Sequence, residues 1–325
     1  MQNSPRNTTA PHKPRHRASR RDDAAPAGWR RTCPASIPYS TMGHNLLSSP
    51  RIAACRALLS DMAMSDKFNR NPEQHDRAMN EVFPVYIERV TLRAVMAHLL
   101  VPGTCLSEGR LADAFGASRA TVREALVRLE GRGLVRVVAK RGWFIPEQGR
   151  EEIRATCEAR RIIQIGILRL TVPLPPDRAA AGLRHLARQR AAMEDGDISH
   201  LSFLLADFHV WLARLLDNPI LTENMRSLMA RSSLALPRPT PHDARIIHGE
   251  YHALVHAMTA GDMARAQKLL LTRIESAQVP SECPHAPPSP PDLKTALAPV
   301  LRRIKRETAH SSPAPNPYRQ PETRV

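Results

Sequence analysis

Four side chains at positions 118 to 123 of this 325-residue chain have the chemistry needed to read DNA: Ser118, Arg119, Thr121 and Arg123. An arginine can donate two hydrogen bonds to O6 and N7 of one guanine. Serine and threonine hydroxyls can bond phosphate oxygens or base edges. At the N-terminal end of a helix that follows a tight turn, these residue types read the major groove. We therefore expect Arg119 and Arg123 to contact bases, assisted by Ser118 and Thr121.

A second basic group is expected to hold the DNA backbone. Arg110, Lys140 and Arg141 suit phosphate contacts, which position a protein without selecting a sequence. Gly142 would let the main chain approach the minor groove. Two further arginines, Arg128 and Arg132, are predicted to lie on a solvated helix face.

The elements that position these residues follow from the apolar pattern. Leu111, Ala112 and Phe115 predict a helix that ends at Gly116, and Ser118 is a typical N-cap for the next. Residues 134–138 and 143–145 predict two strands joined by a basic turn. A helix over 84–100 and a short strand at 104–106 are expected to precede these two helices. This pattern is that of a winged helix-turn-helix.

The segment PGTCLSEGRLADAFGASRATVREALVRLEGRGLV, residues 102–135, resembles the DNA-binding domain of the GntR family of bacterial transcription regulators. The match covers the turn, the second helix and the start of the wing. The resemblance implies that Arg119 and Arg123 approach an operator. It also implies a dimer that binds a palindromic site.

Residues 150–278 are helical almost throughout in their pattern, with breaks at Pro-rich and Gly-containing turns. Expected helices cover 151–170, 178–194, 199–216, 220–234, 243–259 and 262–277. The region resembles the FCD ligand-binding domain found in one branch of GntR proteins. The resemblance rests on three segments, CEARRII, DFHVWLARLLDNPIL and EYHALVHAMTAGDMARAQKLL.

The fold class expected is therefore mainly α, with an N-terminal winged helix-turn-helix, a C-terminal all-α bundle and disordered tails. The boundaries are 1–80 for a basic extension, 81–147 for the DNA-binding domain, 150–278 for the effector-binding and dimerisation domain, and 279–325 for a Pro-rich tail. Within the outer segments only 52–64 and a basic helix at 293–304 show apolar periodicity.

FCD domains commonly hold a divalent metal through an Asp and a His four residues apart and two later histidines. His209 matches the first histidine, but Leu205 stands at the Asp position, and the later positions correspond to Tyr251 and Arg273. The usual metal site is therefore expected to be lost, with no cofactor. An alternative metal site would combine His209 with His248 and His252, which with His256 form a stripe along one helix.

Arg160 occupies the place where the FCD pattern has an inward-facing arginine that often meets an organic-acid effector. Its planar guanidinium can grip a carboxylate with two hydrogen bonds. The expected effector-binding residues are Arg160, His209, Tyr251 and Arg273. An ion pair between Arg160 and Glu158 or Glu152 is the alternative.

Charge and composition agree with a two-part protein. The formal charge is +16, yet residues 144–278 hold 17 basic and 15 acidic side chains, so the surplus lies in the tails and the DNA-binding segment. Five scattered cysteines suggest reduced thiols. No apolar run is long enough to span a bilayer, so no membrane partner and a cytoplasmic location are expected.

The sequence thus predicts a DNA-binding transcription regulator, a repressor acting as a homodimer, whose operator affinity responds to a small carboxylate effector. The alternative is a constitutive DNA-binding protein whose helical domain only dimerises, without effector or metal. An enzyme is not expected, because no nucleophile with a placed base, paired carboxylates or phosphate-binding loop occurs.

Overall fold

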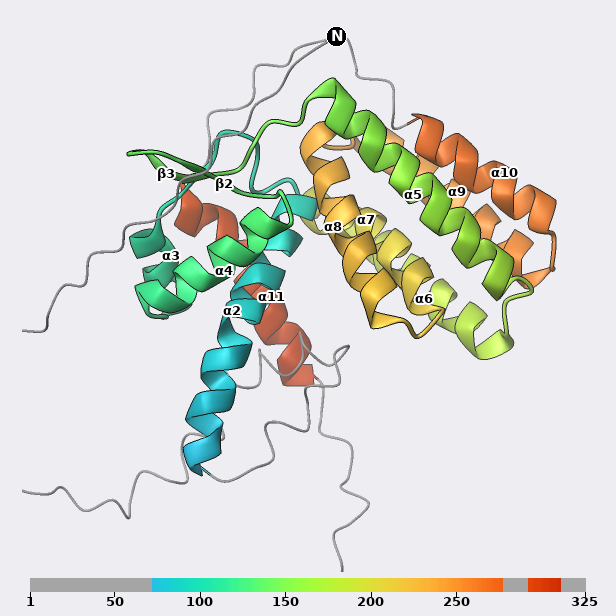
Figure 1. Cartoon of the computed structure of the whole chain (residues 1–325). Helices are drawn as coiled ribbons and strands as arrows, with labels where there is room; N and C mark the ends of the chain where they lie inside the picture. Colours follow the sequence, from blue (N-terminus) through green and yellow to red (C-terminus); the bar gives the residue numbers. More distant parts are fainter. Residues whose placement is uncertain (1–71, 277–291, 311–325) are drawn as a thin grey trace, which may run out of the picture. The chain divides into compact units, whose positions relative to one another are not determined.

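The computed structural model describes residues 72–276 and 292–310, with side chains described for 82–276 and 292–307. The N-terminal half of this region contains α2 (Pro72–Met96), β1 (Cys105–Leu106), α3 (Glu108–Phe115), α4 (Arg119–Gly131), β2 (Arg136–Val138) and β3 (Gly142–Phe144) (Figure 1). The predicted segment 52–64 lies outside the described residues.

The strands form a small antiparallel sheet in the order β1-β3-β2. Cys105 pairs with Phe144, and Val137 pairs with Trp143. The short strand expected before the first helix therefore does join the wing. Together with α3 and α4, the sheet makes the winged helix-turn-helix that the sequence predicts.

The helix under this module is longer than expected, because it begins at Pro72 and includes Pro84. It also ends at Met96, four residues earlier than the sequence suggests, and His98 then has a positive φ of 53°. The apolar run to Leu100 persists because the residues after Met96 pack on the core without being helical. Apolar periodicity reports burial, and a turn that follows a helix can be just as buried.

The helical region contains α5 (Arg150–Thr171), α6 (Pro176–Glu194), α7 (Ile198–Arg214), α8 (Pro219–Ala235), α9 (Pro241–Thr259) and α10 (Met263–Ser276). Side-chain caps begin four of them, including α10, where the carboxylate of Asp262 accepts from the amide of Arg265. The carboxylate of Asp197 accepts from the amide of His200, Asn218 caps α8, and Thr240 with Asp243 forms a capping box. The six helices predicted in this region are therefore present, with ends shifted by a few residues.

The centre of this bundle is α7, which is buried along nearly its whole length. Phe208 of α7 is fully buried and stacks on Tyr251 of α9, with ring centroids 4.1 Å apart. Trp211 lies so close to α6 that a Cβ added at Gly182 would stand 2.8 Å from its ring. Glycine at 182 is therefore what allows α6 to approach α7.

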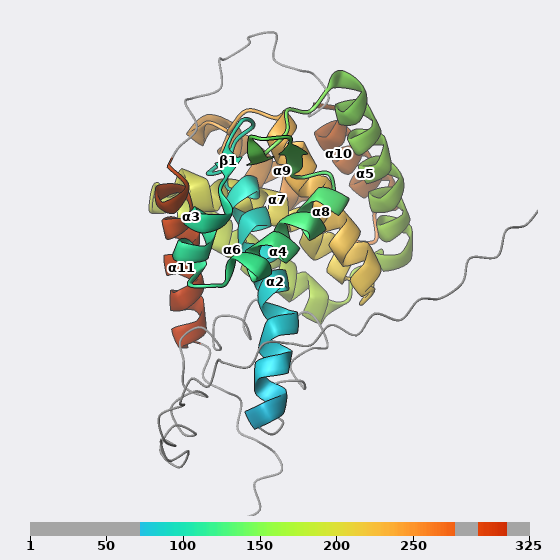
Figure 2. The same ribbon diagram turned by 60° about the vertical axis from the view of Figure 1, so that its left-hand side comes forward.

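The last described helix is α11 (Leu293–His310), which packs against α2 and α3 (Figure 2). Its buried face consists of Leu293, Ala296, Leu297, Val300 and Ile304. The sequence predicts a short helix here within a largely disordered tail, so the packing is a finding beyond that expectation. No helix in the described ranges is both long and apolar enough to cross a bilayer.

Candidate nucleic-acid interface and ligand pocket

The N-terminal end of α4 is built as the sequence predicts. Oγ of Ser118 accepts a hydrogen bond from the amide of Thr121 at 3.1 Å and lies 2.8 Å from its hydroxyl. Arg119, the first residue of α4, is exposed, and its guanidinium lies 3.5 Å from where a Cβ on Gly109 would be. The cap fixes the start of the helix and leaves Arg119 available to a ligand.

Arg123 is held in place by a residue that the sequence analysis did not single out. Its Nε and Nη2 donate to the carboxylate of Glu108 at 2.8 and 2.7 Å, and Nε1 of Trp143 donates to the same carboxylate at 3.2 Å. Hydrogen bonds from Arg123, opposed in part by burial, lower the pKa of Glu108 below its usual value. The network ties α3, α4 and β3 together and restricts the orientation of Arg123.

The tip of the wing is exposed and basic. Lys140 and Gly142 both have positive φ, 63° and 97°, which makes the turn tight. The guanidinium of Arg141 stands over the ring of Phe144, 5.2 Å from its centroid. Arg110, exposed on α3, lies 3.6 Å from Asp292 at the start of α11. The structure thus distributes the predicted phosphate-contact residues over α3 and the wing.

The predicted solvated face is wrong for Arg132, which is partly buried, whereas Arg128 is exposed as predicted. Both arginines reach Glu88 of α2, which is only 1% exposed: Nε of Arg132 lies 2.6 Å from Oε1, and Nε of Arg128 lies 3.1 Å from Oε2. The main-chain carbonyl of Arg132 also accepts two hydrogen bonds from Arg231 of α8, at 3.1 and 2.6 Å. A buried carboxylate needs such partners, but no sequence pattern indicates that Glu88 faces α4.

A cavity of about 240 Å³ opens in the helical bundle, and all four predicted effector-binding residues line it. Arg160 comes from α5, His209 from α7, Tyr251 from α9 and Arg273 from α10. Residues from four helices, far apart in the sequence, therefore meet at one site. Ser202, Ser232 and Ser233 add hydroxyl groups to the lining.

Arg160 is the least exposed cation of this cavity, at 2%. Its Nη1 donates to Oγ of Ser232 at 3.1 Å, whereas its Nε is buried without a hydrogen-bond partner. Burial lowers the pKa of its guanidinium. Glu152 and Glu158 are exposed, and neither forms an ion pair with Arg160, so the alternative ion pair is not found among the described residues. Arg273 instead pairs with Glu250, 3.3 Å away.

A chain of hydrogen bonds runs through His209. Nε2 of Gln164 lies 3.0 Å from Nδ1, Nε2 of the ring lies 2.9 Å from the hydroxyl of Tyr251, and that hydroxyl donates to the carbonyl of Leu205 at 3.2 Å. With Gln164 donating to Nδ1, the ring is neutral and carries its proton on Nε2. Burial first, and then repulsion by Arg160 and Arg273, holds the pKa of His209 well below its usual value.

These residues do not fit the divalent metal of the FCD pattern. Both ring nitrogens of His209 already have partners, and Leu205 contributes a carbonyl that is bonded to Tyr251. Arg160 and Arg273 add positive charge where a cation would bind. Among the described residues, no three His, Cys, Asp or Glu side chains gather as a metal site.

The alternative set of His209, His248 and His252 is not brought together. Nδ1 of His248 lies 3.0 Å from Oε1 of Gln189 on α6, while His252 is exposed and His209 is buried. His256 is exposed as well. None of the three histidines of the stripe lines the cavity.

Gln164 and Ser232 were missed by the sequence analysis. Gln164 follows Arg160 by one helical turn, and this spacing is the signal that could have found it, because the two share a face of α5. Ser232 gave no such signal, since only the packing of α8 on α5 brings it to Arg160.

Comparison with known proteins gives two matching family models. The model described as "Bacterial regulatory proteins, gntR family" matches residues 90–145, and the FCD domain model matches residues 155–276. Together they cover more than half of the chain. The first contains α3, α4 and the wing, and the second contains Arg160, His209, Tyr251 and Arg273 of the cavity.

Individual proteins agree with these models. The HTH-type transcriptional repressor RspR of Escherichia coli (strain K12) is 27% identical over 155 residues, which are 47% of this chain and 68% of RspR. The structure of E. coli McbR/YncC has a TM-score of 0.55 at 24% identity and covers 60% of this chain and 94% of McbR. A putative GntR regulator from Rhodococcus sp. RHA1 has a TM-score of 0.51 at 26% identity, with 60% and 95% covered.

These matches fall on the two regions whose geometry is described above, a winged helix-turn-helix with an exposed arginine-bearing helix end and a helical bundle with a buried arginine pocket. The chain belongs to the gntR family of bacterial regulatory proteins, in the group with an FCD domain, and is a DNA-binding transcriptional regulator, not an enzyme.

Proposed function

We propose that this regulator is a ligand-responsive repressor that binds a palindromic operator as a homodimer and is controlled by a small organic acid. The observation that carries the proposal is the unpartnered Nε of Arg160, buried at a cavity that also contains Arg273. The effector would be a carboxylate that contacts Arg160 directly.

The energetics favour an anionic ligand at this point. A buried guanidinium with one neutral hydrogen-bond partner is poorly compensated for its loss of water. A carboxylate would supply both the missing acceptor and the opposite charge, in the bidentate geometry that arginine favours. The hydroxyl groups of Ser202 and Ser233 would be near enough in the lining to orient the rest of the molecule. No metal is required for this mode of binding.

Dimerisation is supported by an apolar stripe on α5. Ile162 is 65% exposed and Leu170 is 74% exposed, and Gly166 lies between them on the same face. A glycine in such a stripe permits two helices to approach closely. We propose α5 as part of the contact between two copies, with the two reading helices then presented to two half-sites.

A short path connects the cavity to α4. Ser232 of α8 contacts Arg160, and the preceding residue, Arg231, donates two hydrogen bonds to the carbonyl of Arg132 at the C-terminal end of α4. A ligand that shifts α8 when it binds Arg160 would therefore act on the reading helix. Such a shift would change the spacing of the two reading heads.

The test is a fluorescence-anisotropy titration of the full chain against its own promoter DNA, with and without EDTA, across a panel of organic acids. We expect one class of acid to release the DNA and EDTA to have no effect. Arg160→Ala should bind DNA normally but lose the response. Arg161→Ala, which removes an exposed arginine from the adjacent position of α5, is the matched control and should keep it.

Two outcomes would contradict parts of this proposal. Tight promoter binding that no acid changes would favour the constitutive alternative, in which the helical region only dimerises. Equal affinity for promoter and random duplexes would exclude operator recognition. Sedimentation of Ile162→Glu tests the dimer separately, and an unchanged mass would exclude α5 from the contact.

A further inference from the structure

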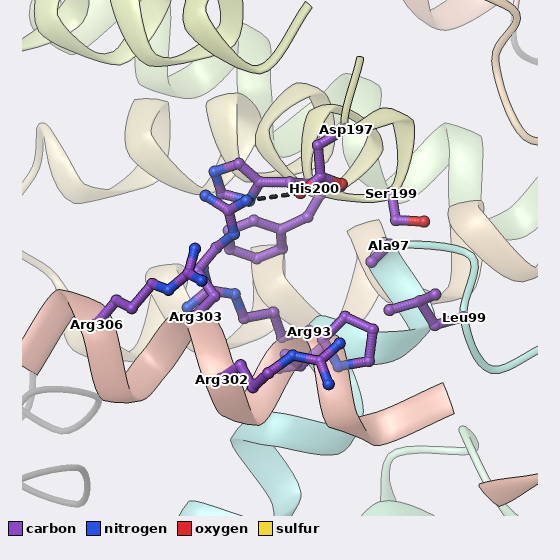
Figure 3. Close-up of a pocket in the computed structure, with 12 residues that line it drawn as sticks. Arg93, Ala97, Leu99, Asp197, Ser199, His200, Arg302, Arg303 and Arg306 are labelled. Carbon is purple, nitrogen blue, oxygen red and sulfur yellow. Dashed lines mark hydrogen bonds and ion pairs between the residues drawn. The ribbon is translucent and has the colours of Figure 1, made fainter. Parts of the chain in front are cut away.

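A second cavity lies outside the pocket around Arg160. It has a volume of about 270 Å³ and is formed by α2, the N-terminal end of α7, and α11 (Figure 3). Its charged lining consists of Arg93, Arg302, Arg303, Arg306 and Asp197. Neither family model extends to α11, so this cavity belongs to a part of the chain that the family description does not include.

Arg303 and Arg93 are each paired with an acid. Nη2 of Arg303 donates to Oδ2 of Asp197 at 2.6 Å, and Arg93 makes two hydrogen bonds to Glu307, at 2.9 and 2.8 Å. These pairs also fix the cavity walls, because each joins α11 to another helix. The lining together with Glu307 carries four positive and two negative formal charges.

The floor of the cavity is shielded and the rim is open. Arg93 is buried, and its guanidinium lies over the ring of Phe203, 4.4 Å from the centroid. Arg302 at the rim is exposed and makes no hydrogen bond or ion pair with any described residue. A compact ligand could thus enter past Arg302 and meet cations on more than one side.

His200 also lines this cavity, and its pKa is sensitive to the nearby arginines. Burial, followed by repulsion from Arg303 and Arg93, lowers the pKa of its imidazole to about 3. The ring is therefore neutral at physiological pH, and it can accept or donate a hydrogen bond without adding a counter-charge. The part of this shift that comes from Arg303 and Arg93 is a positive potential, which would attract an anion in the same space.

We propose that this cavity is a binding site for a small anion with at least two negative charges, a phosphorylated or polycarboxylic metabolite, held by Arg302, Arg303 and Arg306. A divalent anion would add negative charge to a lining in which arginines outnumber acids. The concave shape and the buried position of Arg93 suit a compact molecule better than the backbone of a DNA duplex. The site is separate from the proposed effector pocket, and neither depends on the other.

Isothermal titration of the full-length protein at constant ionic strength tests the site, with pyrophosphate, citrate and acetate as probes. We expect pyrophosphate or citrate to bind and acetate not to. Tighter binding of pyrophosphate would assign the site to phosphorylated ligands, and tighter binding of citrate to polycarboxylic acids. Arg302→Ala should weaken the binding at least tenfold, and because Arg302 is exposed the variant should fold, as circular dichroism would verify.

Two controls separate the cavity from other basic surfaces. Lys294→Ala removes an exposed charge of α11 that does not line the cavity, and Arg160→Ala alters only the first pocket. Both should leave pyrophosphate and citrate binding at this site unchanged. The proposal is overturned if neither anion binds, if acetate binds equally well, or if Lys294→Ala weakens binding as much as Arg302→Ala. Weaker binding of random DNA by Arg302→Ala, with no binding of small anions, would instead assign the arginine to DNA phosphates and overturn the proposal as well.

Discussion

The hydroxyl of Tyr251 lies 2.9 Å from Nε2 of His209 and donates its own proton to the carbonyl of Leu205. The resemblance to the FCD pattern predicts metal ligands at these two positions, and in the structure the two side chains are bonded to each other. Their ring planes are perpendicular, with centroids 5.4 Å apart. A tyrosine that accepts from a histidine and donates to a carbonyl satisfies a buried polar site without a cation.

Tyr251→Phe removes both of these hydrogen bonds while keeping the ring that stacks on Phe208. Because Nε2 of His209 and the carbonyl of Leu205 would lose this partner inside the core, we expect the free energy of unfolding to fall by about 1–3 kcal/mol. Burial raises the pKa of Tyr251 to about 12, so its hydroxyl stays protonated in the test. Urea unfolding followed by circular dichroism measures the change, and an unaltered midpoint would mean that the chain of bonds is absent.

Acid should destabilise the protein before its carboxylates titrate. The pKa of His98 is lowered to about 4 by burial and by Arg238, and burial lowers that of His185 as well. These histidines stay neutral in the folded protein but take up protons near pH 6.5 in the unfolded chain. Their contribution to the free energy of unfolding is therefore fully present above pH 6.5 and is lost as the pH falls toward the pKa of the folded state.

The variant His98→Asn tests this dependence, because asparagine tolerates the positive φ at position 98. Between pH 6.5 and 4.5, its unfolding free energy should fall less steeply with decreasing pH than that of the original protein. Parallel curves for the two proteins would contradict the assignment of His98 as a neutral buried group.

Gly182→Ala should weaken the bundle because the added methyl group meets the ring of Trp211 at 2.8 Å. We expect a loss of about 1–3 kcal/mol, typical of overpacking in a close-packed core. Gly249→Ala is the matched control: this glycine is also inside a helix, but its added Cβ meets nothing within 4 Å. It should gain up to about 1 kcal/mol from better helix propensity. Equal effects of the two changes in thermal unfolding would refute the proposed contact.

The two classes of DNA contact can be separated by variants of α4 and the wing. Arg119→Ala should reduce the preference for the operator over random DNA by about 1–3 kcal/mol, as expected for loss of a base contact. Lys140→Ala should weaken binding to both duplexes alike and lower the slope of log affinity against log salt by about 0.9. Anisotropy titrations over several salt concentrations give both quantities. If Lys140→Ala instead changed the operator preference alone, its assignment to phosphate would be wrong.

The sequence predicted local structure better than it predicted charge pairing. The turn between α3 and α4 was predicted from two single residues. Gly116 ends α3 with a φ of 60°, and Ser118 caps the start of α4, as expected. The partners of Arg132 could not be predicted, because Glu88 and Arg231 come from helices 44 positions before and 99 positions after it. Pairing at such distances depends on how helices pack, which apolar periodicity does not encode.

The cavity around Arg160 was predicted in part. Arg160, His209, Tyr251 and Arg273 were found by resemblance to a family pattern, and they line one cavity. Periodicity alone would have placed all of them on helix faces without showing that those faces converge. The contribution of α11 to a cavity was not predicted at all. In the sequence its arginines resemble an ordinary solvated helix face, and only the structure shows that Arg303 pairs with Asp197.

The contact between Arg231 and α4 is made to the main chain of Arg132, not to its side chain. Gly133, with a φ of 67°, leaves room for the same guanidinium, and a Cβ there would overlap its Nη2. Substitutions at position 132 therefore leave this link intact, whereas any side chain at 133 obstructs it. A genetic screen for regulators that bind their operator but ignore their inducer should accordingly recover changes at positions 133 and 231, and the codon for residue 132 should tolerate replacement.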